Sequence, residues 1–209
     1  MSAARVVLAT RNPGKVVELR RILAEEPALA GVDVELVGLE EFPDAPDVEE
    51  TGTTFAENAL LKARAIAEHT GLAAVADDSG LCVDALDGDP GVRSARWAGE
   101  PSDDVANLDL VLRQVAEVPD DRRTAHFTCA AAAVLPDGAE QVVEASMRGS
   151  LVRAPRGTGG FGYDPVFVPT GESRTTAEMP PAEKDAISHR GQAFRALAPV
   201  LAELLRPPS

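Results

Sequence analysis

Residues 72–80, Leu-Ala-Ala-Val-Ala-Asp-Asp-Ser-Gly, decide the fold that we expect for this chain. Leu72–Ala76 is a short continuous apolar run, which is typical of a buried strand. Asp77, Asp78 and Ser79 follow directly, and we expect the chain to turn sharply at Gly80. Carboxylates at the C-terminal end of a strand lie where α/β folds bind their ligands. An Asp-rich turn without any chemistry would use the same residue types, so this stretch alone leaves both interpretations open.

The rest of the chain predicts an α/β fold with a mixed sheet. Apolar runs predict further strands at Val6–Ala9, Val34–Leu39, Phe127–Leu135, Gln141–Ser150 and Pro165–Val168. Helices are expected from Asn12 to about Glu25, from Thr54 to Thr70, over Asp103–Val118, and from about His189 onward with a break or kink at Pro199. Pro136-Asp137-Gly138 predicts a hairpin. Without an internal repeat or linker, residues 1–209 are expected to form one domain.

Composition narrows the classes of protein and of site. The 209 residues carry a net charge of −14, which argues against non-specific nucleic-acid binding, because that needs a basic surface. No apolar run approaches the roughly 20 residues of a membrane span, and the first run is too short for a signal peptide, so we expect a cytoplasmic protein. The three histidines lack zinc-ligand spacing, and the two cysteines, Cys82 and Cys129, are expected to be reduced core residues.

The segment that joins the first strand to the first helix has the composition of a phosphate-binding loop. It comprises Thr10, Arg11, Asn12, Pro13, Gly14 and Lys15. Backbone N–H groups at a helix N-terminus, with a hydroxyl, an amide and an ammonium, favour a bound phosphate. The segment lacks the Walker A pattern. An ordinary capped helix start with a solvated lysine remains the alternative.

Three further segments carry candidate ligand-binding side chains. The stretch 157–162 fits the pattern G-x-G-x-x-G, but neither a strand before it nor a helix after it supports a dinucleotide site, so we interpret it as a loop that presents Phe161 for stacking on a flat ligand. Ser188-His-Arg-Gly191 gathers hydrogen-bond donors close to Lys184. Asn58 and Lys62 share one helix face, downstream of the acidic pair Glu49-Glu50. Taken singly, each of these also fits a capped helix, a loop packed on the core or a solvated surface.

Taken together and in order, these motifs resemble the XTP/dITP diphosphatase family, the inosine triphosphate pyrophosphatases. The resemblance rests on five segments that span nearly the whole chain: Thr10-x-Asn-x-x-Lys15, Glu49-Glu-Thr-Gly52 with Phe55-x-Glu-Asn58-Ala-x-x-Lys62, Ala76-Asp-Asp-Ser-Gly80, Gly160-Phe-Gly-Tyr-Asp-Pro165 and Ser188-His-Arg-Gly191. It implies an elongated mixed sheet flanked by helices, with two lobes around a central nucleotide-binding cleft. It also implies a homodimer.

The resemblance further implies Mg²⁺-dependent hydrolysis of ITP, dITP and XTP to the monophosphate and pyrophosphate. Glu50 and Asp78 are then expected to hold Mg²⁺, with Asp78 as general base. The residues implied to bind substrate are Thr10, Arg11, Asn12, Pro13, Gly14, Lys15, Lys62, Ser79, Phe161, Gly162, Tyr163, Asp164, Lys184, His189 and Arg190.

Elementary chemistry fits these roles. Successive strand residues point to opposite faces of a sheet, so Asp77 and Asp78 are expected to have different roles. Hypoxanthine and xanthine carry an acceptor oxygen at the 6-position where adenine carries an amino donor. Donors from His189 and Arg190 would therefore favour the oxo bases. Two alternatives stay open: a pyrophosphatase for modified pyrimidine nucleotides, and a nucleotide-binding protein without catalysis.

Overall fold

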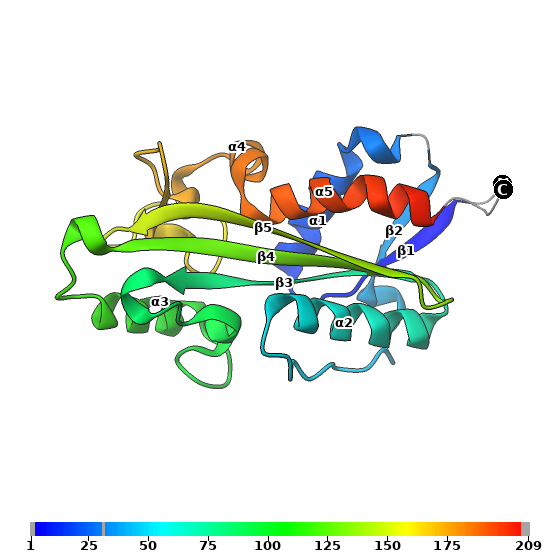
Figure 1. Cartoon of the computed structure of the whole chain (residues 1–209), viewed down its shortest axis with the longest axis horizontal. Coiled ribbons are helices and arrows are strands. Elements are labelled where there is room, and N and C mark those ends of the chain that lie inside the picture. Colours follow the sequence, from blue (N-terminus) through cyan, green and yellow to red (C-terminus); the bar gives the residue numbers. More distant parts are fainter. Residues whose placement is uncertain (1–2, 31, 206–209) are drawn as a thin grey trace. The chain divides into compact units, whose positions relative to one another are not determined.

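The computed structural model describes residues 3–30 and 32–205, which group into two compact units. The first unit comprises Met1–Asp78, Cys129–Ala145 and Arg190–Ser209, and the second comprises Ser79–Thr128 and Ser146–His189. Strands β3, β4 and β5 contribute residues to both units. The chain forms a six-stranded sheet in the order β2-β1-β3-β4-β5-β6, flanked by helices (Figure 1). The predicted α/β fold with a mixed sheet is confirmed.

The strands are β1 (Ala4–Leu8), β2 (Val34–Gly38), β3 (Ala73–Val83), β4 (Thr124–Val134), β5 (Glu140–Leu151) and β6 (Phe167–Pro169). The helices are α1 (Pro13–Ala24), α2 (Phe55–Thr70), α3 (Asp104–Gln114), α4 (Pro181–Ile187) and α5 (His189–Leu204). β1 pairs in parallel with β2 and with β3, whereas β5 and β6 are antiparallel. The sheet is therefore mixed.

In the first unit, side-chain alternation along the strands builds two apolar cores on opposite faces. Leu8 and Val75 pack with α1 and α5, whereas Val7, Ala74 and Ala76 pack with α2. Figure 1 shows α1 and α5 on one side of these strands and α2 on the other. Because β1 and β3 are covered on both faces here, Val6–Leu8 and Ala73–Ala76 are continuous apolar runs, as in most parallel strands.

The helix starts of the first unit follow the predicted sequence signals. Asn12 caps α1 through its side chain, which accepts a hydrogen bond from the backbone N–H of Lys15. Thr54 and Glu57 form a reciprocal capping box at the start of α2. The left-handed Gly71 ends that helix with a φ of 66°. These local signals fix the positions of the two helices beside β3.

The second unit has a core of its own. The end of β3 contributes Leu81 and Val83, and these pack with Val111 of α3, Phe127 of β4 and Phe167 of β6. The segment 157–163 between β5 and β6 is irregular, as predicted from its glycines. The short helix α4 follows, and its last residue lies two positions before the start of α5.

Two expectations about local structure are wrong. The chain does not turn at Gly80, because β3 continues to Val83 and buries Leu81 and Val83 completely in the second core. Helix α5 likewise has no break at Pro199, because it continues from His189 to Leu204, and the kink predicted as the alternative stays a prediction. A proline inside a helix costs about 3 kcal/mol. Leu197 and Leu201 on either side of it are fully buried, and burying a leucine stabilises by about 1.5–3 kcal/mol. The packing of this helix therefore offsets the cost.

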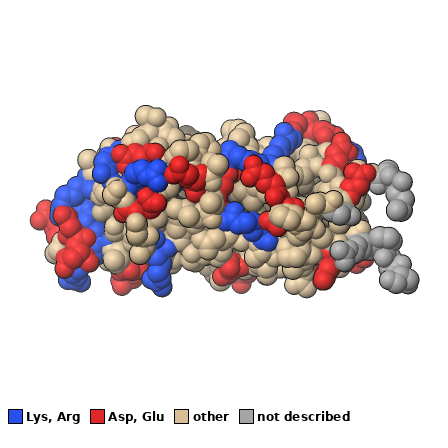
Figure 2. Space-filling model, turned by 90° about the horizontal axis from the view of Figure 1, so that it is seen from above, with Lys and Arg blue, Asp and Glu red and all other residues tan. Residues whose placement is uncertain are grey.

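The charged side chains at the surface are interspersed. Figure 2 shows Lys and Arg close to Asp and Glu on the face that it draws. Arg174, for example, forms ion pairs with both Glu172 and Glu183. Among residues 3–30 and 32–205, no helix has the length and apolar composition of a membrane span.

Candidate active site

The loop between β1 and α1 presents backbone donors at the start of α1. Asn12 accepts the N–H of Lys15 at 3.2 Å, and its own N–H donates to the hydroxyl of Thr10 at 3.2 Å. Pro13 and Gly14 form the first turn of the helix, where N–H groups have no partner within the helix. Arg11 points instead to the acidic loop that precedes α2, and pairs with Asp47 at 2.8 Å. The loop therefore has the backbone arrangement of an anion-binding helix start.

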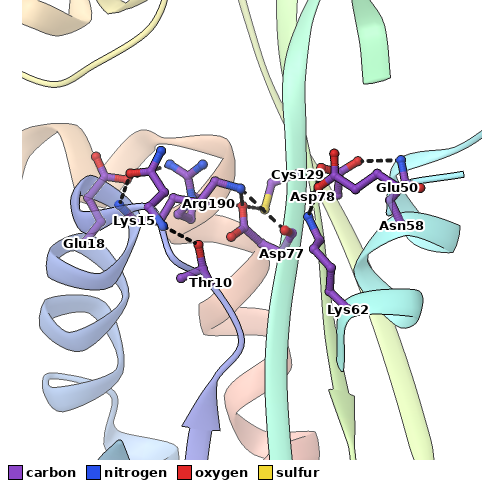
Figure 3. Close-up of polar contacts among 11 residues, drawn as sticks. Thr10, Lys15, Glu18, Glu50, Asn58, Lys62, Asp77, Asp78, Cys129 and Arg190 are labelled. Carbon is purple, nitrogen blue, oxygen red and sulfur yellow. Dashed lines mark hydrogen bonds and ion pairs between the residues drawn. The ribbon is translucent and has the colours of Figure 1, made fainter. Parts of the chain in front are cut away.

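This loop reaches the edge of β3 at the two carboxylates. The pairing of β1 with β3 ends at Leu8 and Val75, so β3 continues past the last residue of β1. The ammonium of Lys15 lies 3.5 Å from the backbone oxygen of Asp77 and 2.9 Å from its carboxylate. Figure 3 shows that Asp77 and Asp78 point to opposite sides of that strand, as predicted.

On the α2 side of β3, two carboxylates share one ammonium. Lys62 Nζ lies 2.7 Å from Glu50 Oε1 and 3.2 Å from Asp78 Oδ1 (Figure 3). Burial lowers the pKa of Lys62, but the charges of Asp78, Asp77 and Glu50 outweigh that effect and raise it. The pKa of Asp78 is raised by its burial and by Glu50, although Lys62 acts in the opposite direction. Asp78 is thus a carboxylate with increased basicity, as a general base requires.

Asn58 connects the acidic loop to Asp78. Its Nδ2 donates to Asp78 Oδ2 at 3.1 Å, and its Oδ1 accepts the backbone N–H of Gly52 at 2.8 Å. A Cβ on Gly52 would lie 2.6 Å from that oxygen, so the close approach needs glycine. Asn58 therefore fixes the segment that carries Glu50 relative to Asp78.

On the α1 and α5 side of β3, Asp77 belongs to a buried network of four charges. Asp77 Oδ2 accepts from Lys15 Nζ at 2.9 Å and from Arg190 Nε at 3.2 Å, and Arg190 Nη1 donates to Glu18 Oε2 at 2.6 Å. Burial alone would raise the pKa of Asp77, but Lys15 and Arg190 together lower it far below its usual range. Two cations thus balance two anions inside the first unit, and Lys15 is held by a carboxylate that stays ionised.

Cys129 lies beneath this network, with its sulfur 3.9 Å from Asp77 Oδ2. Burial and the charge of Asp77 raise the pKa of its thiol. Cys82 and Cys129 are both free, as predicted, and Cys129 is an inert core residue.

In the second unit, Asp164 gathers donors around the glycine-rich loop. Its Oδ2 accepts from Lys184 Nζ at 2.7 Å and from the backbone N–H of Phe161 at 2.9 Å. Lys184 Nζ also lies 5.3 Å from the centre of the Phe161 ring, in cation–π geometry. Lys184 and Asp164 are buried, and Phe161 is partly exposed. The predicted grouping of Phe161, Asp164 and Lys184 is therefore present within this unit.

The remaining predicted residues of the second unit have diverse surroundings. The imidazole of His189 stacks on Phe127 with ring centres 4.7 Å apart and an angle of 8°. Tyr163 donates its hydroxyl to the backbone oxygen of Ser94, and its ring belongs to the core. The N–H of Gly162 donates to Asp104. Ser79 lies in β3, partly buried. Contacts of these residues with a substrate stay predictions.

The pair Glu50 and Asp78 fits a magnesium ion that is shared with a substrate. No cluster of three or more His, Cys, Asp or Glu side chains suited to a metal occurs among residues 3–30 and 32–205. These described residues therefore do not provide a metal site whose ligands all come from the protein. Mg²⁺ is commonly held by one or two carboxylates together with water and substrate phosphates. Glu50 and Asp78 already converge on one cationic group, which is the arrangement that such an ion needs.

Sequence reasoning missed several residues of the two units. Glu18 lies three positions after Lys15 on α1, and this helical spacing was a usable signal. Phe127 under His189, and Thr176, which donates its hydroxyl to Asp164 at 2.8 Å, come from distant segments and gave no local signal. The structure also places two donor nitrogens of Arg190, Nε and Nη1, on carboxylates of its own unit.

Comparison with known proteins gives a consistent assignment. The Ham1 family model matches residues 6–200 of this chain. A dITP/XTP pyrophosphatase of Streptomyces coelicolor is 64% identical over 201 residues, which are 96% of this chain and 98% of that protein. A dITP/XTP pyrophosphatase of Mycobacteroides abscessus is 54% identical over 201 residues, which are 96% of either chain.

Solved structures are similar over nearly the same length. A HAM1 protein from Coxiella burnetii superposes with a TM-score of 0.83 at 42% identity, and covers 96% of this chain and 99% of its own. The Ham1 protein of Staphylococcus aureus has a TM-score of 0.82 at 37% identity, again with 96% and 99% covered.

Proposed function

We propose that this chain, which belongs to the Ham1 family, hydrolyses dITP, XTP and ITP to the nucleoside monophosphate and pyrophosphate and so removes non-standard purines from the nucleotide pool. One observation carries the proposal: a loop suited to phosphates, with Lys15, lies at the edge of β3 where Asp78 and Glu50 share Lys62. The relatives named dITP/XTP pyrophosphatase support the class of substrate.

The phosphates of the substrate would bind first to the segment Thr10–Lys15. Its backbone N–H groups at the start of α1 favour negative charge, and Lys15 adds a positive charge. Asp77 orients Lys15, since a carboxylate with a strongly lowered pKa keeps its negative charge throughout the neutral range. Lys62 supplies a second cation on the opposite face of β3. Phosphoryl transfer depends mainly on such positioning and charge neutralisation.

Glu50 and Asp78 would hold Mg²⁺ together with the substrate phosphates. When bound, the ion neutralises charge that builds up on the phosphate oxygens during bond cleavage. Asn58 keeps Glu50 and Asp78 in register through its bonds to Gly52 and Asp78. Lys62 lies within reach of both carboxylates, so it offsets the repulsion between them.

Asp78 would accept the proton of the attacking water. The water oxygen bonds to the α-phosphorus, the bond from that phosphorus to the bridging oxygen breaks, and pyrophosphate leaves. Burial raises the pKa of Asp78 in the protein without metal, and a bound Mg²⁺ would keep the carboxylate ionised, so that it can accept the proton at neutral pH. General base catalysis of this kind typically contributes a factor of about 10²–10⁴.

In the second unit, the purine would stack on Phe161 and meet donors from Lys184 and His189. The ring of His189 is fixed by Phe127, so its edge has a defined direction. A donor at that edge pairs with the 6-oxo group of hypoxanthine or xanthine and opposes the amino group of adenine. Arg190 was expected to share this role. We propose that it acts mainly by holding Asp77, because its guanidinium forms buried ion pairs with Asp77 and Glu18.

The test is pyrophosphate release from dITP, XTP and ITP beside ATP, GTP and UTP, with Mg²⁺ or with EDTA. We expect metal-dependent release from the oxopurine nucleotides, with the monophosphate as the other product. Preferred turnover of UTP would favour a pyrimidine pyrophosphatase, and binding of ITP without turnover would favour a non-catalytic protein. Equal turnover of ATP would refute the role given to His189.

We also propose that the protein works as a cytoplasmic homodimer. The family resemblance supports the dimer, and the nucleotide pool on which this reaction acts is cytoplasmic. Sedimentation equilibrium of the purified chain tests the dimer, for which we expect twice the 21.9 kDa mass of one chain.

A further inference from the structure

Asp164 is the centre of a buried cluster in the second unit. Its carboxylate is almost inaccessible to solvent, and it accepts hydrogen bonds on both oxygens. Oδ2 receives the N–H of Phe161 and the ammonium of Lys184. The orientation of this one carboxylate therefore determines the place of the loop that carries Phe161 and the place of Lys184.

The hydroxyl of Thr176 holds the other oxygen of the same carboxylate. Its Oγ1 lies 2.8 Å from Asp164 Oδ1 and 3.1 Å from the backbone oxygen of Asp164. Thr176 is only 1% exposed, so water does not readily replace this bond. With Oδ1 fixed, the carboxylate cannot rotate, and Oδ2 stays directed at Phe161 and Lys184. Leaving a buried acceptor unsatisfied costs about 1–3 kcal/mol, which gives this bond a measurable weight.

The turn that contains Thr176 also packs directly against the glycine-rich loop. Thr175 and Glu178 close this turn as a reciprocal capping box. The backbone oxygen of Ala177 accepts the N–H of Gly159 at 3.0 Å. A Cβ on Gly157 would lie 2.5 Å from the carbonyl carbon of Ala177. The backbones of loop and turn are thus in direct contact, and a side chain at Gly157 would separate them.

We propose that Thr176 is a positioning residue for nucleoside recognition: it orients Asp164, and Asp164 in turn holds Phe161 and Lys184 in the arrangement that receives the base. This inference rests on the function proposed above. It makes the base-recognition loop a preformed element, built before the nucleotide arrives, so that binding does not have to order it.

The test uses three variants of the full chain. Thr176→Val removes the hydroxyl at nearly constant volume, and Thr176→Ser keeps a hydroxyl. Thr124→Val is the control, because Thr124 also donates its hydroxyl to an aspartate of the second unit, but to Asp84 and not to Asp164. Thermal unfolding of each variant establishes that it is folded.

Two readouts separate positioning from stability. For Thr176→Val we expect the KM for dITP to rise about tenfold with kcat changed less than twofold, since a lost buried hydrogen bond in recognition has this size. Amide hydrogen exchange at Phe161 should become about tenfold faster in the same variant. Thr176→Ser should restore both quantities to within about threefold of the wild type, and Thr124→Val should leave both unchanged.

The outcomes distinguish the inference from the proposed function. An unchanged KM or unchanged exchange at Phe161 in folded Thr176→Val overturns the inference, as does an equal effect of Thr124→Val. If the wild type fails to hydrolyse dITP, the proposed function fails. The exchange at Phe161 then still decides whether Thr176 orients Asp164.

Discussion

Arg190→Met tests whether the buried network around Asp77 stabilises the first unit. The Arg190 side chain is 4% exposed, and its guanidinium joins Asp77 at 3.2 Å and Glu18 at 2.6 Å. Methionine keeps much of the volume but removes the charge. Asp77 then keeps its ion pair with Lys15, and Glu18 loses its ion pair with Arg190.

The expected loss of stability follows from burial. Removing one partner of a buried ion pair leaves an uncompensated charge and costs about 3–5 kcal/mol, whereas an exposed pair contributes about 0–1 kcal/mol. For a chain of this length, each kcal/mol lowers Tm by about 2–4 °C. We therefore expect Arg190→Met to lower Tm by about 6–20 °C.

Urea unfolding at pH 7 measures the free energy directly, with Arg174→Met as the control. Arg174 also has two carboxylate partners, but its side chain is 42% exposed, so its removal should cost less than about 1 kcal/mol. Adding Glu18→Gln to Arg190→Met should recover about 1–3 kcal/mol, because the second change removes the buried charge that Arg190 had neutralised.

The destabilisation caused by Arg190→Met should also depend on pH. Without Arg190, the pKa of Asp77 should rise, since one of the two cations that lower it is gone. Protonation of Asp77 then removes a negative charge that Arg190 no longer neutralises, so the destabilisation by Arg190→Met should shrink as the pH falls. A loss no larger than that of Arg174→Met at pH 7 would refute the reasoning.

Three further predictions concern single residues. Asp78→Asn should lower kcat by about 10²–10⁴-fold in a pyrophosphate-release assay, and a kcat within tenfold of the wild type would remove Asp78 as the base. Urea unfolding of this variant should show no loss of stability, because the raised pKa of Asp78 means that folding disfavours its charge. The lowered pKa of Asp77 contributes stability that is fully present above its unfolded pKa of about 3.9 and is lost as the pH falls below that value. In thermal unfolding with EDTA, the Tm of the wild type should therefore fall more steeply with acid than the Tm of Asp77→Asn, and parallel curves of Tm against pH would contradict this. Phe127→Leu should raise the KM for dITP severalfold, because it removes the ring on which His189 stacks. The control Phe194→Leu, an equally conservative change in the core of the first unit, should lower Tm without changing KM, and equal KM values in the two variants would argue against a role of Phe127.

Local signals in the sequence predicted most of the fold. The N-cap at Asn12, the capping box at Thr54 and Glu57 and the hairpin turn at Pro136–Gly138 all depend on neighbours within a few residues, and the structure has each of them. The opposite directions of Asp77 and Asp78 followed from strand geometry alone. The turn at Gly80 was wrong because the burial of Leu81 and Val83 depends on α3, β4 and β6, which lie far along the chain.

The site was predictable as a set of residues and much less so as a set of contacts. Arg190 and Glu18 are 172 positions apart, so no periodicity links them, and the pattern of donors around His189 suggested a contact with the base. Thr176 carries no motif and gains its importance from Asp164, 12 positions earlier. The hydrogen-bond partners of buried polar groups depend on the tertiary fold. Sequence patterns indicate only those partners that lie within one or two helical turns along the chain.

The opposite orientation of Asp77 and Asp78 makes the spacing along β3 intolerant of small insertions. One extra residue between Val75 and Asp77 would turn Asp77 toward Lys62 and Glu50 and turn Asp78 toward Lys15 and Arg190. The two carboxylates would then exchange their electrostatic surroundings although no chemical group had been lost. Two extra residues would restore the faces but move both groups by about 6–7 Å along the strand, away from every partner. A frame-preserving change of one codon here should therefore be as damaging as deletion of either aspartate.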